Sequence, residues 1–268
     1  MPDWAIAVVL GIVEGITEFL PVSSTGHLII VGELVGLSSE LENTFEIVIQ
    51  FGAVLAVIGF YWADLVSQLR GLRQEPDVRR LWLGIGIAFV PAAVVGLLLR
   101  DYITEYLFHP VPVGIALIAG GIVFLFMEWT GLADRTDDDI SLEGITLRQA
   151  LAVGLFQTLA LVPGVSRSGA SIVGGLVAGM NRTVATQFSF YLAIPTLGLA
   201  TLYELLTSMG QLSSAGLVNI FIGAVVSGVV AWLSIGWLLR YVAQHTFVLF
   251  GYYRIVIGLI IVIFFQFQ

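Results

Sequence analysis

The sequence predicts an all-α integral membrane protein that folds as a single membrane domain over residues 1–268. Hydrophobic residues make up 58% of the chain and charged residues only 11%, and the mean hydropathy is +0.98. A polar pentapeptide, VSSTG at residues 22–26, returns as VSRSG at residues 165–169. The composition indicates membrane insertion, and the returning pentapeptide indicates two copies of one unit.

Six apolar runs approach the roughly 20 residues that a helix needs to cross a bilayer. They cover residues 47–63, 81–99, 110–127, 183–203, 215–239 and a C-terminal run that ends at Gln268. The N-terminus carries no basic segment and no small-residue cleavage site. We therefore expect no removable signal peptide and a first segment that stays in the protein.

The pentapeptide belongs to a longer repeat. Its offset of 143 residues also carries Phe45 onto Phe188, which gives repeats of about 1–129 and 144–268. Short segments interrupted by Gly or Pro surround each copy, at 4–19 and 25–37 and again at 149–162 and 168–180. Apolar segments of about 10 to 14 residues are typical of re-entrant pieces. Each repeat is then a re-entrant helix pair plus three transmembrane helices, and the odd number of spans gives the repeats inverted topology.

The arginines support this arrangement, because short cytoplasmic loops carry an excess of basic residues. All 11 basic residues are Arg. The loops 64–80, 130–148, 181–183 and 240–248 share one side and hold Arg70, Arg73, Arg79, Arg80, Arg135, Arg148, Arg182 and Arg240. The other side, with both termini and the loops 38–46, 100–109 and 206–214, holds only Arg100. We expect a multi-pass plasma-membrane protein with cytoplasmic Arg-rich loops, and with both termini and the opening of the site outside.

Composition excludes several function classes. Cysteine is absent, so disulfides, thiolate catalysis and Cys-based metal sites are excluded. The formal net charge is −8 without a basic patch, so no nucleic-acid partner is expected. Membrane lipids are expected partners, and no pattern in the chain specifies an oligomeric state.

Two carboxylates stand in the first short segment. Glu14 and Glu18 are four residues apart and so lie on one face of a helix. They repel each other unless a cation or an arginine lies between them, and ionisable residues inside a membrane are functional by default. The alternative is a wetted helix end that faces an aqueous cleft. Oxygen ligands favour a hard divalent cation, Mg²⁺ or Ca²⁺, so Glu14 and Glu18 are the candidate metal ligands.

A run of small polar residues follows these carboxylates. Glycine permits a tight turn, Ser or Thr can cap the helix that follows, and the exposed N–H groups of a helix N-terminus bind anions. An imidazole near a hydroxyl can act as its base, or as acid to a leaving oxygen. The run offers Ser24 as nucleophile, His27 as its acid–base partner, and anion-binding groups in Ser23, Thr25 and Gly26. The alternatives are simple helix caps and an ordinary interfacial histidine.

In the second repeat Arg167 lies between Ser166 and Ser168, just before Gly169, in another turn that leads into an apolar helix. A buried guanidinium needs an anionic partner, and its planar fork suits phosphate and carboxylate alike. Arg167 is therefore expected to bind phosphate, with the two serines and the glycine adding donors. The alternatives are a pair with a carboxylate of the first repeat, which is compatible with phosphate binding, and a side chain that snorkels to the surface. Together the halves supply equipment for phosphoryl transfer in a lipid setting.

The motifs EGITEFLPVSSTGH at 14–27 and PGVSRSG at 163–169 resemble the signatures of the undecaprenyl-diphosphate phosphatase family of the bacitracin-resistance type. The likeness covers essentially the whole chain, including TFEIVIQFGAVLAV and FSFYLAIP. It implies inverted repeats whose re-entrant pairs form the site. It also implies outward-facing, cation-dependent hydrolysis of the terminal phosphate of a polyprenyl diphosphate, which yields the monophosphate carrier. By the same resemblance, roles in activity fall on Glu14, Glu18, Ser24, Thr25, His27, Ser166, Arg167 and Ser168. The Lys-free, acidic composition departs from familiar members and leaves the chain length of the lipid open.

We expect Arg167 to hold the phosphates, and Glu14 and Glu18 to hold the cation or to orient the nucleophile. Ser24 would then attack, with His27 as base or acid. Direct attack by water is the competing route. Inverted repeats with broken helices also form secondary transporters, so a transporter or flippase of an anionic or phospholipid-like substrate is the alternative function.

Two further patterns keep two readings each. Glu46 and Gln50, one turn apart at the head of the first full span, either border the cleft or belong to a wetted helix end. Arg254, near the start of the last span, either snorkels to the surface or pairs with a charge.

Overall fold

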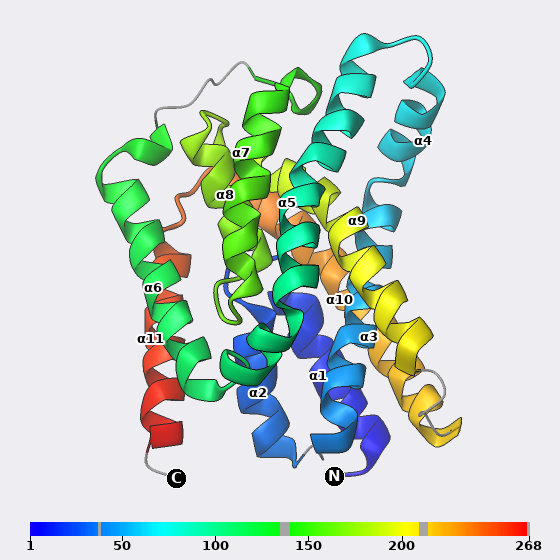
Figure 1. Ribbon diagram of the computed structural model, residues 1–268, viewed down its shortest axis with the longest axis vertical. Coiled ribbons are helices and arrows are strands. Elements are labelled where there is room, and N and C mark those ends of the chain that lie inside the picture. Colours follow the sequence, from blue (N-terminus) through cyan, green and yellow to red (C-terminus); the bar gives the residue numbers. More distant parts are fainter. Residues whose placement is uncertain (37–38, 135–139, 209–213, 267–268) are drawn as a thin grey trace.

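The computed structural model describes residues 1–36, 39–134, 140–208 and 214–266. Within these ranges every regular element is a helix, with eleven α-helices and three 3₁₀ segments (Figure 1). The all-α prediction is therefore confirmed.

Two pairs of short helices occupy the positions of the expected re-entrant pairs. The first pair is α1 (Asp3–Thr17) and α2 (Ser24–Val35). The second is α7 (Leu147–Gln157), continued by a 3₁₀ turn over Thr158–Leu161, and α8 (Arg167–Val177). None of the four exceeds 15 residues, so each rises at most about 22 Å, less than the roughly 30 Å of a bilayer core.

The remaining helices include the long apolar ones. They are α3 (Ser39–Phe60), α4 (Trp62–Gly71), α5 (Pro76–Tyr106), α6 (Pro110–Trp129), α9 (Arg182–Ser208), α10 (Ser214–Val242) and α11 (Val248–Gln266). Four helices of the described ranges are long and apolar enough to cross a membrane, over residues 76–103, 110–129, 218–242 and 248–266. A fifth span results if the bent pair α3 and α4 counts as one. This is a multi-pass membrane protein.

Two of the six expected spans differ from the prediction. The expected span 47–63 is not straight, because helices 49–60 and 62–71 meet at an angle of 67°. The expected span 183–203 is helical within α9, but α9 is not among the helices apolar enough to pass the test of length and composition. Thr186, Ser189 and Thr201 lower its hydropathy, and all three are buried against protein at 0–1% exposure.

Close backbone contacts hold the long helices together. α1 and α3 pack against α10, α6 packs against α11, and α7 packs against α5. A Cβ on Gly15 would lie 2.6 Å from the carbonyl oxygen of Ser227, and a Cβ on Gly121 would lie 2.6 Å from that of Gly251. Helices that pack in membranes use small residues in this way, because the backbones can then approach closely.

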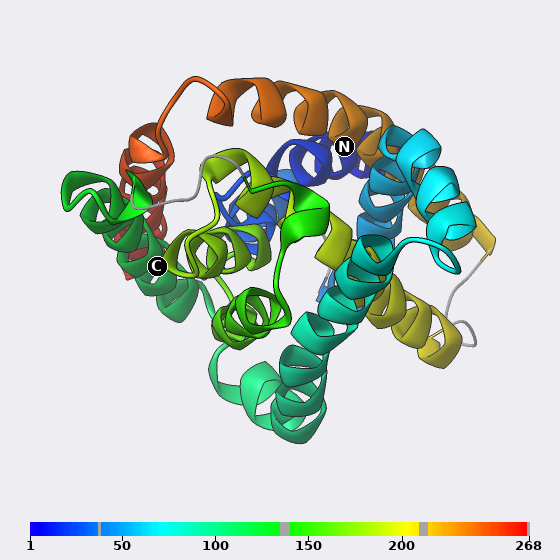
Figure 2. The same ribbon diagram turned by 90° about the horizontal axis from the view of Figure 1, so that it is seen from above.

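The fold places the short helices centrally. Figure 2 shows α7 and α8 surrounded by α5, α6, α11 and α10. Figure 1 shows both termini at one end of the molecule and the α4–α5 connection at the other. That connection and its flanks carry Arg70, Arg73, Arg79 and Arg80, whereas Arg135 lies outside the described residues.

Candidate active site

Ser23 and Ser166 occupy equivalent positions in the two motifs and share an unusual backbone conformation. Their φ angles are 70° and 73°, and no other non-glycine residue of the described ranges has a positive φ. Such a conformation costs about 1–3 kcal/mol per residue, and this kind of strain gathers at functional sites. Each serine directly precedes a helix, since α2 begins at Ser24 and α8 begins at Arg167. Each motif therefore forms a tight turn that leads into a helix N-terminus.

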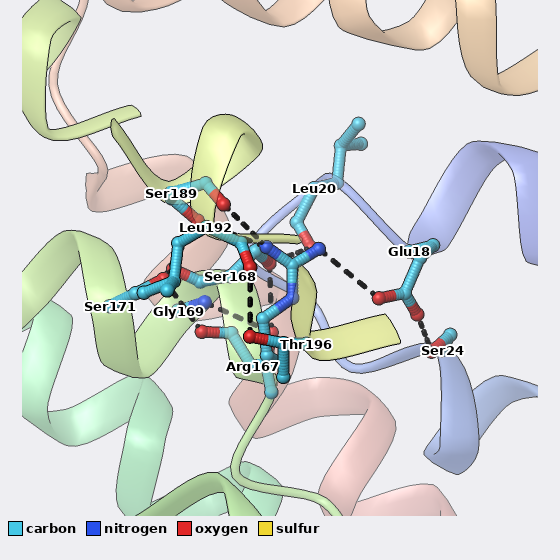
Figure 3. A network of polar contacts seen from close by, with 11 residues as sticks. Glu18, Leu20, Ser24, Arg167, Ser168, Gly169, Ser171, Ser189, Leu192 and Thr196 are labelled. Carbon is cyan, nitrogen blue, oxygen red and sulfur yellow. Dashed lines mark hydrogen bonds and ion pairs between the residues drawn. The ribbon is translucent and has the colours of Figure 1, made fainter. Parts of the chain in front are cut away.

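The two turns meet at Glu18, as Figure 3 shows. Ser24 Oγ donates to Glu18 Oε2 over 2.7 Å, and Arg167 Nη2 donates to Glu18 Oε1 over 3.2 Å. The side chains of Arg167 and Glu18 are 10% and 5% exposed, so this ion pair is nearly buried. The expected pairing of Arg167 with a carboxylate of the first repeat is confirmed, and the snorkelling alternative is wrong because the side chain lies inside the protein.

The guanidinium of Arg167 is also held by Ser189 of α9 and by Phe19, just after α1. Nη1 donates to the carbonyl oxygen of Ser189 over 2.8 Å and lies 3.3 Å from Ser189 Oγ. Ser171 Oγ, on α8, lies 2.7 Å from the same hydroxyl. The ζ carbon of Arg167 lies 5.6 Å from the centre of the Phe19 ring, within cation–π range. The phosphate-binding candidate is thus fixed in place by the protein itself.

The other residues of the second motif bind each other and the first turn. Ser166 Oγ accepts a hydrogen bond from the Gly169 N–H over 3.1 Å and lies 3.1 Å from Ser168 Oγ. Ser168 Oγ donates to the carbonyl oxygen of Leu20 over 2.9 Å. Because Ser168 is 0% exposed, its hydroxyl joins the two turns to each other instead of facing a ligand.

A cavity of about 160 Å³ opens beside this network. Among its lining residues are six of the expected site residues: Glu18, Ser23, Ser24, Thr25, Ser166 and Arg167. A water molecule takes up about 30 Å³ in the liquid, so the cavity has room for a phosphate group and a few waters but not for a lipid tail. Five expected residues do not line it: Glu14, Gly26, His27, Ser168 and Gly169.

His27 has partners other than Ser24. Its Nδ1 lies 2.8 Å from the carbonyl oxygen of Ser23, and its Nε2 lies 2.7 Å from the hydroxyl of Tyr253 on α11. Because a carbonyl only accepts, Nδ1 carries the proton, and Nε2 of the neutral ring accepts from Tyr253. The two rings also stack, with centroids 5.5 Å apart. The group in hydrogen-bond contact with Ser24 is therefore Glu18, and a role of His27 as base for Ser24 stays a prediction.

The two candidate metal ligands are close in the chain but differ in surroundings. Glu14 lies one turn before Glu18 on α1, is 0% exposed, and interacts electrostatically with Arg167. In the ranges described, no group of three or more His, Asp or Glu side chains could hold a metal ion. The chain therefore offers one or two carboxylates, which fits the way Mg²⁺ takes its remaining ligands from substrate phosphates and water.

The motif glycines provide space for neighbouring side chains. A Cβ on Gly26 would lie 2.6 Å from Cδ1 of Leu117, on α6. A Cβ on Gly169 would lie 3.1 Å from Nη1 of Arg254, on α11. Both glycines allow the turns to pack tightly, and their expected part in binding the ligand stays a prediction.

Sequence reasoning missed Ser189, although a serine in the apolar run FSFYLAIP was a usable signal. Gln50 lines the cavity, so of its two interpretations the one that places it at the border of the cleft is confirmed. The Glu46 side chain lies outside the described residues.

Both interpretations of Arg254, snorkelling to the surface and pairing with a charge, are wrong. It is 0% exposed and donates to backbone carbonyls, and none of the ion pairs among the described residues includes it.

Comparison with known proteins gives matches along almost the whole chain. The family model described as "Bacitracin resistance protein BacA" matches residues 7–260. The undecaprenyl-diphosphatase of Deinococcus radiodurans is 47% identical over 264 residues, which cover 97% of this chain and 95% of that protein. The undecaprenyl-diphosphatase of Albidiferax ferrireducens is 49% identical over 259 residues, with 95% and 92% covered. The one from Methylococcus capsulatus is 47% identical over 261 residues, with 97% and 94% covered. The resemblance seen in the two motifs is confirmed, and the chain belongs to the bacitracin resistance protein BacA family.

Proposed function

We propose that this chain is an undecaprenyl-diphosphatase, a membrane hydrolase that removes the terminal phosphate of undecaprenyl diphosphate. The product is the lipid monophosphate that carries glycan precursors during cell-envelope synthesis. Relatives of that name match nearly the full length at 47–49% identity. The observation that carries the proposal is the shared contact of Ser24 and Arg167 with Glu18, because it joins a hydroxyl, a base and a phosphate-binding guanidinium in one hydrogen-bonded chain.

The cavity is the binding site for the diphosphate. The terminal phosphate lies between Arg167 and the N-termini of α2 and α8, whose N–H groups and dipoles favour an anion. Arg167 then exchanges Glu18 for phosphate oxygens, and the hydroxyls of Ser23, Thr25 and Ser166 on the cavity wall add donors. Ser168, Gly26 and Gly169 contribute by shaping the turns. A cavity of about 160 Å³ accepts only the headgroup, so the tail stays among the lipid-facing sides of the spans.

Ser24 is the proposed nucleophile. Its Oγ attacks the terminal phosphorus while its proton passes to Glu18 Oε2, 2.7 Å away. The Oγ–P bond forms, the bond from that phosphorus to the bridging oxygen breaks, and undecaprenyl phosphate leaves. Water then cleaves the phosphoserine and releases phosphate. The competing route is direct attack by water activated by Glu18, with Ser24 only binding phosphate.

His27 remains the expected acid for the leaving oxygen. The role requires its Nε2, which accepts from Tyr253 at rest, to take up a proton and to exchange the Tyr253 hydroxyl for the substrate. A contact that is made only with substrate is compatible with the resting geometry, because catalytic hydrogen bonds often tighten only in the complex.

A divalent cation, Mg²⁺ or Ca²⁺, is proposed as the cofactor, held by Glu14 and Glu18 together with diphosphate oxygens. When bound, it would neutralise negative charge on the phosphates. The oxygen-only donor set supports this, since Mg²⁺ commonly binds one or two carboxylates plus substrate phosphates.

The helix contacts support inverted repeats within one membrane domain. Adding 143 residues carries α1 onto α7 and α5 onto α10. The contacts follow the same correspondence, since α1 packs on α10 and its counterpart α7 packs on α5, the counterpart of α10. In Figure 1, α1 begins at the end with the termini and α7 begins at the opposite end. We extend this to the membrane, with the Arg-rich end in the cytoplasm and both termini and the site opening outside.

Phosphate release from undecaprenyl diphosphate, in detergent with Mg²⁺, tests the proposal. The assay compares wild type with Arg167→Ala and Glu18→Ala, each with and without a chelator. Release that needs the cation and collapses in both variants would support a hydrolase whose site draws on both motifs. Folded, monodisperse wild type that releases no phosphate would contradict the hydrolase and favour the transporter of an anionic lipid.

A further inference from the structure

Arg254 lies on α11 inside the protein, and the reaction above does not use it. Its relative exposure is 0%. Nη1 donates to the carbonyl oxygen of Pro21 over 3.1 Å, and Nη2 donates to those of Gly164 and Val165 over 3.0 and 2.9 Å. A longer contact of 3.4 Å joins Nε to the carbonyl oxygen of Leu117, on α6. Among the described residues, the acceptors of this guanidinium are therefore all backbone carbonyls.

These acceptors belong to both motif turns. Pro21 lies two residues before Ser23, in the first turn. Gly164 and Val165 directly precede Ser166, in the second turn. One guanidinium thus joins the two backbone segments that lead into the N-termini of α2 and α8.

The surroundings of Arg254 are built to receive it. A Cβ on Gly120 would overlap the guanidinium, and a Cβ on Gly169 would lie 3.1 Å from Nη1. The ring of Phe124 lies 5.9 Å from the ζ carbon of Arg254. A charged group at membrane depth is costly, and its partners here are neutral. The positive charge therefore lies beside the two motif turns with no counter-charge among its hydrogen-bond partners.

We infer that Arg254 is a positioning residue for the hydrolysis, an inference that rests on the proposed function. By joining the two turns it sets the position of Ser24, at the start of α2, relative to Arg167, at the start of α8. It also binds the negative ends of the carbonyl dipoles of residues 21, 164 and 165. Gly164 lines the cavity that accepts the diphosphate, so neutralising these dipoles favours an anion there.

The first test is Arg254→Lys, assayed for kcat, KM and thermal unfolding. Lysine keeps the charge but loses the planar fork that reaches both turns at once. A misplacement of about 1 Å costs roughly 100-fold in rate, so we expect kcat to fall by about 100-fold with KM changed by less than about threefold. The matched control is Arg182→Lys. Arg182 is a partly buried arginine that binds Glu128 and Asp134 away from the cavity, and its variant should keep the wild-type kcat per folded molecule.

A second variant, Gly120→Ala, leaves Arg254 in place and pushes its guanidinium off the carbonyls. We expect the same loss of kcat from it. Gly59→Ala is its control, because a Cβ on Gly59 meets nothing within 4 Å. Gly120→Ala decides the question if Arg254→Lys does not fold.

A double-mutant cycle separates positioning from general stability. In an Arg167→Lys background the guanidinium that the second turn positions is already absent. Arg254→Lys should then lower kcat by less than about a tenth of the factor by which it lowers kcat in the wild type. An equal fold-loss in both backgrounds, or a wild-type kcat in both Arg254→Lys and Gly120→Ala, would overturn the inference. Wild type is assayed in the same preparations, so absence of release there would contradict the proposed function itself.

Discussion

Replacing Glu18 with glutamine keeps the size of the side chain but removes both the base and the charge. In the wild type Glu18 accepts from Ser24 through one oxygen and from Arg167 through the other. The amide that takes the place of the carboxylate has one oxygen and one NH₂ group, and the guanidinium, which only donates, takes the oxygen. The NH₂ group then faces Ser24 and donates to it. The nucleophile loses the acceptor for its proton while the shape of the site is preserved.

The magnitudes follow from these contacts. Losing a positioned general base costs about 10²–10⁴-fold in rate, so turnover of Glu18→Gln should fall by that factor. The stability should fall as well. One charge-assisted hydrogen bond of about 1.5–3 kcal/mol becomes a neutral one of about 0.5–1.5 kcal/mol, and the nearly buried guanidinium of Arg167 loses its ion-pair partner, a change that typically costs about 3–5 kcal/mol. Glu128→Gln is the matched control. Glu128 accepts from Arg182 over 3.1 and 2.5 Å and from the backbone N–H of Phe247 over 2.8 Å, so its replacement also destabilises the fold.

Phosphate release per folded molecule should therefore separate the two variants, although the thermal unfolding midpoint falls in both. Glu18→Gln loses turnover, whereas Glu128→Gln keeps its turnover per folded molecule. Turnover of Glu18→Gln above about a tenth of wild type, or an equal loss in Glu128→Gln, would refute Glu18 as the base of the reaction.

Three further outcomes follow from the geometry. Ser24→Ala should abolish turnover and the phosphoserine that acid quenching traps in wild type, and near-normal release from it would exclude the covalent route. Tyr253→Phe removes one neutral hydrogen bond to His27, worth about 1 kcal/mol, so turnover should fall by less than about tenfold. A loss of turnover as large as that of His27→Ala would show that the tyrosine itself acts in the chemistry. Gly15→Val would press on the carbonyl oxygen of Ser227 and should abolish the monodisperse peak on size exclusion, whereas its control Gly59→Val should behave as wild type. Equal yields of monodisperse protein from the two variants would contradict the close packing of α1 on α10.

Much of the site was predictable from the sequence because polar residues are conspicuous in an apolar chain. Glu18, Ser24 and Arg167 stand out for this reason, and the pairing of the arginine with a carboxylate follows from the cost of an isolated charge. The direction of His27 was not predictable. Its distance along the helix from Ser24 suggests a partnership, but its partner is Tyr253, 226 residues away, and no local pattern reveals that contact.

The spans show the same limit. Window hydropathy marks helices that face lipid, and α6, α10 and α11 were found in this way. It describes α9 poorly, because Thr186 and Ser189 face protein. The bend after α3 has no proline to announce it, and it lies where Tyr61 packs against Tyr191 of α9, with ring centroids 4.9 Å apart. Contacts between distant segments decide these features.

The packing of α1 on α10 has a consequence for the order of folding. α1 leaves the ribosome before its main partner α10, which begins at Ser214. Contacts of such high sequence separation form late, since the intervening chain has to be ordered first. Arg254 reaches both motif turns from α11, which follows all other helices of the described residues in the sequence. The nascent chain therefore holds both motifs before α11 can join them, and we expect activity only after α11 is inserted.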